Sequence, residues 1–197
     1  MSGDKLYVCP LGKVVDTVRA TGARSLVTIL TAGAASVRPC EIAPPRHLRL
    51  ALSDIETPLE GHVLPGAEHV TRLLAFLQEW DRAAPLVIHC YAGVSRSPAA
   101  AYIGACALSP QRCEFEIASE LRRASPSATP NRRLVELADR LLGRDGRMIA
   151  AIASIGRGAD CIEGEPFAIE LAAAKAPPRA RGRISQTARA AVASTSG

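Results

Sequence analysis

Residues 85–98 read PLVIHCYAGVSRSP, and they predict a buried strand, a short loop and a helix in direct succession. The apolar run 85–89 shows no polar alternation, which predicts a strand buried on both faces of a parallel sheet. From Ser97 the sequence favours a helix. Ser97 is a preferred N-cap, Pro98 suits the first helical position, and residues 99–101 are alanines, the best helix formers. Residues 90–96 are therefore predicted to form a loop around a helix N-terminus.

Such a loop is suited to an anion, because backbone N–H groups converge at a helix N-terminus. Gly93 lets the backbone turn and approach an oxyanion closely. The other loop residues are expected to contribute backbone N–H groups rather than side-chain chemistry. The predicted phosphate-binding set is Tyr91, Ala92, Gly93, Val94, Ser95 and Arg96.

The side chains of this loop add a nucleophile and a fixed cation. The helix N-terminus and a nearby guanidinium both favour the thiolate form of Cys90, and a thiolate is a competent nucleophile. Arg96 can fork two N–H donors onto phosphoryl oxygens, a geometry that lysine cannot hold. Ser97 places a hydroxyl near the sulfur, where it can assist thiolate departure. His89 is expected to orient the loop from beneath through hydrogen bonds.

The stretch HCYAGVSRS (89–97) resembles the active-site signature of the protein tyrosine phosphatase superfamily, His-Cys-(x)5-Arg-Ser/Thr. Residues 125–131, SPSATPN, are similar to the Arg-Pro-x-x-x-Pro-Asn segment of its dual-specificity branch, with Ser125 where that branch often has arginine. LYVCPL and SLVTIL, near the start of the chain, also look like that branch. The resemblance covers roughly residues 5–145 and implies the cysteine-phosphatase fold of a bacterial-type tyrosine phosphatase.

A phosphatase of this kind needs an acid to protonate the leaving oxygen. Asp54 follows a predicted strand, and the carboxyl ends of parallel strands meet at the ligand-binding edge of the sheet. The resembling enzymes also carry an acidic residue at this point. Glu56 and Glu60 in the same loop are rivals, and a solvated turn residue is the alternative for Asp54. Asn131 is expected either to brace one of the two loops or to act as a helix N-cap.

The remaining pattern predicts an α/β fold. Strands are expected at 6–9, 25–31 and 46–53, and helices at 14–21, from 65 onward, and at 97–108, 110–123, 130–142 and 150–155. Strands that alternate with helices, followed by helices alone, predict a three-layer sandwich with a small, mostly parallel sheet flanked by helices. Residues 1–172 are interpreted as one phosphatase domain, and residues 173–197 as a basic, disordered tail.

Charge, hydropathy and cysteine content limit the classes of partner, location and cofactor to expect. Five of the 24 Lys and Arg lie in residues 175–197, which have no acidic residue, so the other 19 are balanced by the 19 Asp and Glu. No nucleic-acid-binding face is therefore expected. No apolar run reaches the roughly 18 residues that cross a bilayer, and no secretory signal is evident, so a reducing cytoplasm is predicted. None of the six cysteines has metal-site spacing, so five are interpreted as buried thiols, and neither metal nor cofactor is expected.

The combined prediction is a phosphatase that forms a phosphocysteine on Cys90 and acts on phosphotyrosine in proteins, with phosphoserine and phosphothreonine as further substrates. The alternatives are a phosphate-binding module without turnover and a phosphatase for a lipid or other small-molecule phosphate. Sulfur transfer and arsenate reduction also use loop cysteines but do not need this set of residues. His47, His62 and His69 are interpreted as ordinary loop or helix residues. The sequence does not predict an oligomeric state.

Overall fold

The computed structural model describes residues 4–171. Its five strands are β1 (Lys5–Pro10), β2 (Ser25–Leu30), β3 (His47–Ala51), β4 (Leu86–Cys90) and β5 (Phe167–Glu170). Its α-helices are α1 (Val14–Thr21), α2 (Ala67–Glu79), α3 (Arg96–Leu108), α4 (Glu114–Ala124), α5 (Arg132–Leu141) and α6 (Arg147–Ile155). Short 3₁₀ turns, η1 (Leu11–Lys13) and η2 (Pro44–Arg46), precede α1 and β3.

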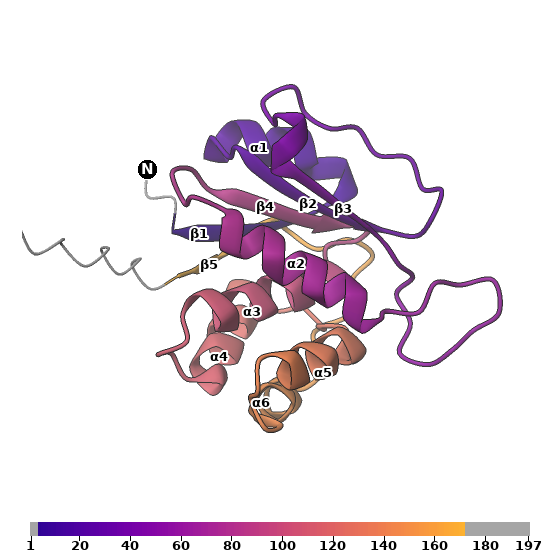
Figure 1. Cartoon of the computed structure of the whole chain (residues 1–197), viewed down its shortest axis with the longest axis vertical. Coiled ribbons are helices and arrows are strands. Elements are labelled where there is room, and N and C mark those ends of the chain that lie inside the picture. The colour runs from indigo at the N-terminus through magenta and orange to yellow at the C-terminus, as the bar shows by residue number, and fades with distance from the viewer. Residues whose placement is uncertain (1–3, 172–197) are drawn as a thin grey trace, which may run out of the picture.

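The strands form one sheet in the order β3-β2-β4-β1-β5, in which the first four are parallel and β5 is antiparallel to β1. Helix α1 covers one face, and α2 to α6 cover the other (Figure 1). The predicted three-layer α/β sandwich is therefore confirmed. Because β1 to β4 run in one direction, the loops after them meet at one edge of the sheet, the edge expected to bind a ligand.

The core has two parts, one on each side of the sheet. The larger part packs the apolar faces of α2 to α6 against Leu6, Ile88 and their neighbours, with Tyr102 fully buried on α3. The smaller part lies under α1 and includes Val14, Val18 and Val87. Strand β4 is buried at every position, as its lack of polar alternation predicted.

Several predicted boundaries are wrong, and one strand was missed. Helix α4 begins at Glu114 rather than Pro110, because residues 109–113 form a turn, and α2 begins at Ala67 after Gly66. Strand β5 completes the sheet edge, although no strand was predicted after residue 90. The predicted tail, 173–197, lies outside the described residues. Within residues 4–171, no helix is long and apolar enough to cross a bilayer.

Candidate active site

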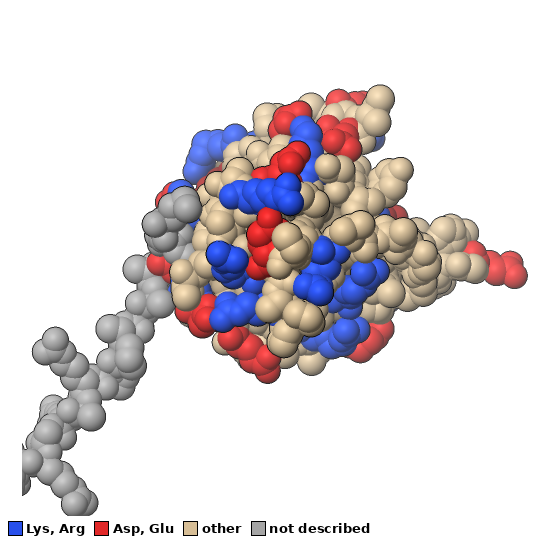
Figure 2. All heavy atoms as spheres, turned by 90° about the horizontal axis from the view of Figure 1, so that it is seen from above, with Lys and Arg blue, Asp and Glu red and all other residues tan. Residues whose placement is uncertain are grey.

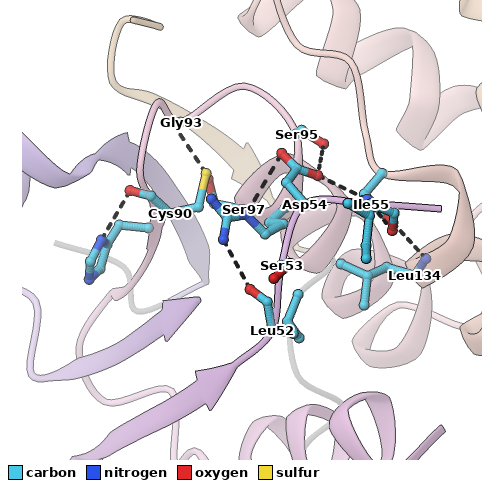
Figure 3. A network of polar contacts seen from close by, with 12 residues as sticks. Leu52, Ser53, Asp54, Ile55, Cys90, Gly93, Ser95, Ser97 and Leu134 are labelled. Atoms are coloured by element: carbon cyan, nitrogen blue, oxygen red, sulfur yellow. Dashed lines mark hydrogen bonds and ion pairs between the residues drawn. The ribbon is translucent and has the colours of Figure 1, made fainter. Parts of the chain in front are cut away.

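The loop from Cys90 to Arg96, called here the Cys loop, leaves the carboxyl end of β4 and enters α3 at the centre of the sheet edge. The Cys90 side chain is buried, and its sulfur accepts hydrogen bonds from the Gly93 N–H at 3.2 Å and the Ser97 hydroxyl at 3.1 Å (Figure 3). Two hydrogen-bond donors, one from the backbone and one from a side chain, are thus aimed at the same sulfur. The structure thus places Cys90, Gly93 and Ser97 together as the sequence predicted.

The carbonyl groups of the Cys loop are bound by the segments around it. Leu11 N–H donates to Tyr91 O at 3.0 Å, and Gly164 N–H donates to Ala92 O at 2.9 Å. Val94 O accepts from Thr129 N–H at 2.8 Å, and Ser95 O accepts from Asn131 N–H at 3.3 Å and Ala99 N–H at 3.0 Å. Because the C=O and N–H of one peptide unit point in opposite directions, carbonyls held outward turn N–H groups inward. The loop is therefore arranged as an anion cradle.

Gly93 is required at its position for two reasons. Its φ is +72°, in the left-handed region that other residues rarely adopt. A Cβ atom there would also lie 2.8 Å from the backbone nitrogen of Pro10. The turn that brings the Gly93 N–H to the sulfur therefore needs glycine.

Helix α3 begins one residue before the expected N-cap. Ser95 is the N-cap and Arg96 the first helical residue, so the prediction of Ser97 as the cap is wrong. Pro98 is tolerated in the first turn because an N–H there has no partner within the helix. The Ser97 hydroxyl, which does not cap the helix, is instead bound to Cys90 Sγ.

Arg96 reaches from the first turn of α3 toward the loop after β3. Its side chain is buried, and Nη1 donates to Leu52 O at 3.0 Å. Its Nε lies 3.7 Å from Asp54 Oδ2 and has no hydrogen-bond partner among the described residues. A buried guanidinium N–H without an acceptor is costly, and a bound oxyanion would supply one.

Asp54 lies in the loop of residues 54–66, called here the acid loop, and contacts the Cys loop directly. Its Oδ1 accepts from the Ser95 hydroxyl at 2.7 Å and from Asn131 Nδ2 at 2.9 Å. Of the two rivals, Glu56 instead accepts the Arg132 N–H at 3.2 Å, at the start of α5. Glu60 is exposed and makes no hydrogen bond or ion pair within the part of the chain that is described. Of the three carboxylates, Asp54 is thus the one that is hydrogen-bonded to the Cys loop.

Asn131 does both of the things that were predicted as alternatives. Its side-chain oxygen accepts the Leu134 N–H at 3.1 Å and so caps α5, while its nitrogen donates to Asp54. The two bonds use the two ends of one amide, so α5 positions the acid loop.

His89 is fully buried beneath the Cys loop, where its Nδ1 is bonded to Cys90 O at 3.3 Å and its Nε2 to Thr28 Oγ1 at 2.7 Å. Burial lowers the pKa of His89 to about 4, so the ring is neutral at neutral pH. An orienting role fits these contacts. His62 and His69 make local bonds to Ser53 and to the Gly66 N–H.

Two features next to the Cys loop were not predicted. The connection from α6 to β5 touches the loop at Gly164, which is buried against Ala92 and Gly93. A hydrogen bond also links Thr28 to His47 at 2.8 Å. The first contact is made by backbone and leaves no side-chain pattern. The second depends on a strand pairing that only the fold reveals.

All six cysteines are free thiols, but only Cys9, Cys90 and Cys106 are buried. The prediction of buried thiols is therefore wrong for the exposed Cys40, Cys113 and Cys161. Burial raises the pKa of Cys9 and that of Cys106 to about 12. Within residues 4–171, no group of three or more His, Cys, Asp or Glu side chains is placed to hold a metal ion.

No protein-family model matches the chain, and no curated protein matches its sequence. Solved structures do match its fold. A human tyrosine phosphatase-like serine/threonine/tyrosine-interacting protein is 14% identical, with a TM-score of 0.56 over 71% of this chain and 92% of that one. Human DUSP28 is 15% identical, with a TM-score of 0.54 over 71% and 94%. The PTP-2 phosphatase of Cydia pomonella is 20% identical, with a TM-score of 0.52 over 68% and 84%.

The chain has the fold of the dual-specificity and tyrosine phosphatases. The predicted fold resemblance is thereby confirmed. At this level of identity the likeness concerns the fold.

Proposed function

We propose that the protein is a cysteine-dependent phosphatase that hydrolyses phosphate monoesters through a phosphocysteine on Cys90. The observation that carries the proposal is the Cys loop itself. Inward N–H groups, a buried guanidinium with an unpartnered Nε, and a sulfur with two donors converge there. This set fits a phosphoryl group, and catalysis of phosphoryl transfer depends chiefly on positioning and charge stabilisation.

The mechanism has two steps. In the first, Cys90 Sγ attacks phosphorus and forms the S–P bond, the P–O ester bond breaks, and protonated Asp54 gives its proton to the departing oxygen. In the second, water attacks phosphorus while Asp54 takes its proton, and the S–P bond breaks. The Ser97 hydroxyl stabilises the departing thiolate, and Arg96 with the loop N–H groups holds the phosphoryl oxygens throughout. The products are an alcohol or phenol and inorganic phosphate.

Phosphotyrosine in proteins is the proposed substrate, with phosphoserine and phosphothreonine as secondary ones. Tyr91 follows the nucleophile and is 69% exposed, so an aromatic side chain lies next to the proposed phosphate-binding loop. The acid loop projects from the body, with an acidic side chain at its tip (Figure 2). It contains Asp54, Glu56 and Glu60 but no Lys or Arg. These charges repel a polyanionic lipid or nucleotide more than a phosphorylated side chain.

The division into a phosphatase domain of residues 1–172 and a tail of residues 173–197 remains a proposal, as does a cytoplasmic location. Six free thiols fit a reducing compartment. The proposed partner is a phosphorylated protein.

The first experiment measures hydrolysis of a generic aryl phosphate in EDTA by wild type, Cys90→Ser and Asp54→Ala. We expect turnover by wild type, none by Cys90→Ser, and a loss of orders of magnitude for Asp54→Ala. An inert wild type that still binds phosphate would favour a binding module. Activity in Cys90→Ser would contradict the covalent mechanism. A second comparison, of phosphotyrosine, phosphoserine and phosphoinositide substrates, tests the proposed preference.

A further inference from the structure

Three hydrogen bonds join His47, on the edge strand β3, to the carbonyl group of Cys90. His47 Nε2 lies 2.8 Å from Thr28 Oγ1, which lies 2.7 Å from His89 Nε2. His89 Nδ1 lies 3.3 Å from Cys90 O, the bond drawn at the Cys90 carbonyl in Figure 3. Thr28 is paired with His89 between β2 and β4, so the sheet register places these side chains next to each other.

This chain of polar groups runs along the sheet face that α1 covers. Thr28 and His89 alternate along their strands with Val27 and Ile88, which belong to the core on the opposite face. Thr28 is 2% exposed and His89 fully buried, while His47 is partly exposed at the sheet edge. Buried polar groups among apolar neighbours are stable only with hydrogen-bond partners, so each link supports the next.

The positions of the protons follow from what each atom can do. A carbonyl oxygen only accepts, so His89 Nδ1 must carry the proton that it donates to Cys90 O. A neutral imidazole carries one ring proton, so His89 Nε2 accepts, and the Thr28 hydroxyl must donate to it. A hydroxyl has a single proton, so Thr28 Oγ1 accepts from His47, which must therefore carry its proton on Nε2.

Both rings are neutral at neutral pH, as this arrangement requires. Burial lowers the pKa of His47 to about 4, assisted by the charges of Arg49 and Arg38. For His89, burial is again the largest cause of a pKa of about 4, with His47 and Arg49 acting in the same direction and the bond to the Cys90 backbone opposing it. A single tautomer of each ring is therefore selected by its hydrogen bonds.

We infer that Thr28 and His47 are positioning residues for the Cys loop, acting through His89. All three bonds donate in one direction, from His47 to the Cys90 carbonyl. A carbonyl held toward His89 turns the Tyr91 N–H of the same peptide unit the opposite way, into the cradle. The Thr28 hydroxyl donates to His89 Nε2 and so stabilises the Nδ1–H tautomer that the bond to Cys90 O requires, and the His47 N–H keeps that hydroxyl directed toward His89. The proton arrangement rests on the hydrogen-bond geometry and on the neutrality of both rings, whereas its effect on turnover rests on the proposed phosphatase activity.

Nitrogen-15 NMR of the histidine rings tests the proton arrangement in the wild-type protein near neutral pH. We expect His89 as the Nδ1–H tautomer and His47 as the Nε2–H tautomer. The variant Thr28→Val removes the hydroxyl at nearly constant shape and should leave His89 in a mixture of tautomers. Thr21→Val removes a hydroxyl that donates to Thr17 O in α1, and should leave both spectra unchanged. A wild-type His89 protonated on Nε2 would overturn the inference.

Kinetics separate positioning from simple stabilisation. For aryl phosphate hydrolysis we expect Thr28→Val to lower kcat about tenfold, and Thr28→Ser, which keeps the hydroxyl, to restore most of it. His47→Gln keeps an N–H donor near the Nε2 position and should exceed His47→Leu in kcat, with KM little changed. Equal kcat for Thr28→Val and Thr28→Ser, both folded by urea titration, would contradict a positioning role.

The NMR result does not depend on turnover, which separates the two proposals. If neither the wild type nor any variant hydrolyses the aryl phosphate, the rate of Cys90 alkylation by iodoacetate replaces kcat as the readout. The variants should then rank in alkylation rate as they are expected to rank in kcat. Correct tautomers with an inert enzyme would count against the phosphatase and not against the polar chain. Correct turnover with the wrong tautomers would count against the polar chain alone.

Discussion

The Cys loop and the acid loop both follow parallel strands, but the surrounding structure holds them differently. The Cys loop is tied by backbone bonds from η1, from residue 129, from α5 and from residue 164. The acid loop is fixed near its base, where Ser53 N–H donates to Val63 O at 2.8 Å and Arg133 to Pro65 O at 2.7 Å. Residues 56–62 are exposed and project from the body (Figure 2). The nucleophile thus belongs to a loop that is held along its length, while the acid belongs to a loop whose outer residues are exposed.

The two loops differ because they meet different parts of the substrate. The phosphoryl group has the same shape in every substrate, so its cradle can be rigid. The rest of the substrate varies, and a projecting loop that carries the acid can contact it. Asp54 itself lies at the junction of the two, where Asn131 and Ser95 hold it. Substitutions in the two loops should therefore differ in size and in substrate dependence.

The largest effect is expected from the nucleophile. Cys90→Ser should lower kcat for aryl phosphate by about 10⁴-fold or more, because a serine hydroxyl is not ionised at neutral pH. Cys113→Ser, at an exposed thiol, is the matched control and should retain wild-type kcat. Steady-state kinetics in EDTA measures both. Equal activity of the two variants would contradict the assignment of Cys90 as the nucleophile.

The next effect concerns the acid and depends on the leaving group. Asp54→Asn should lower kcat/KM, which reports the first step, by roughly 10²–10⁴ for a phosphoester with a poor leaving group, and much less for one with an acidic phenol that departs without a proton. Glu60→Gln, at the tip of the same loop, should change neither rate by more than about twofold, since it touches no group of the site. A loss that is the same for both leaving groups would argue against Asp54 as the acid.

A smaller effect is expected at the residue that joins the acid loop to α5. Asn131→Ala removes the N-cap bond and should lower the free energy of unfolding by about 1 kcal/mol. It should also lower kcat several-fold through the lost bond to Asp54. Asn131→Asp keeps the cap but places a carboxylate beside Asp54, so it should recover stability and not activity. Urea titration and kinetics together separate the two roles, and full activity in Asn131→Ala would show that α5 does not position the acid.

The last effect is a pH dependence of stability, which leaves the chemistry of the site untouched. The pKa of buried His89 is about 4 in the folded protein and about 6.5 in the unfolded chain, so only the unfolded state gains a proton between these values. The free energy of unfolding should be constant above pH 6.5 and fall below it, by about 1.4 kcal/mol per pH unit from His89 at most. His47 acts in the same direction. Urea titrations between pH 7.5 and 5 measure this slope, and a rise in stability toward pH 5 would refute it.

Much of the site was predictable from local sequence. Three features act only on neighbouring residues and can therefore be recognised in the sequence. They are the apolar run of β4, the glycine of the Cys loop and the alanines of α3. Asp54 could be placed because parallel strands end at one edge. The alternation of Phe167 and Ile169 was also a usable signal for β5.

The parts that were missed depend on contacts between distant segments. The bond from Gly164 N–H to the Cys loop uses backbone atoms, which any residue provides. The link from His47 through Thr28 to His89 depends on the register of three strands, so it cannot be predicted from any one segment of the sequence. The helix start at Arg96 differs from the expected one because the Ser97 hydroxyl binds the sulfur rather than the backbone.

The proposed mechanism passes the phosphoryl group through Cys90. Its most direct test is rapid acid quenching of wild type and Asp54→Asn during turnover of an aryl phosphate, followed by mass spectrometry of the peptide that contains residue 90. We predict one phosphoryl group on Cys90, with more accumulating in Asp54→Asn because its second step lacks the base. Turnover with no phosphorylated Cys90 at any time, or with the phosphoryl group on another residue, would contradict the mechanism.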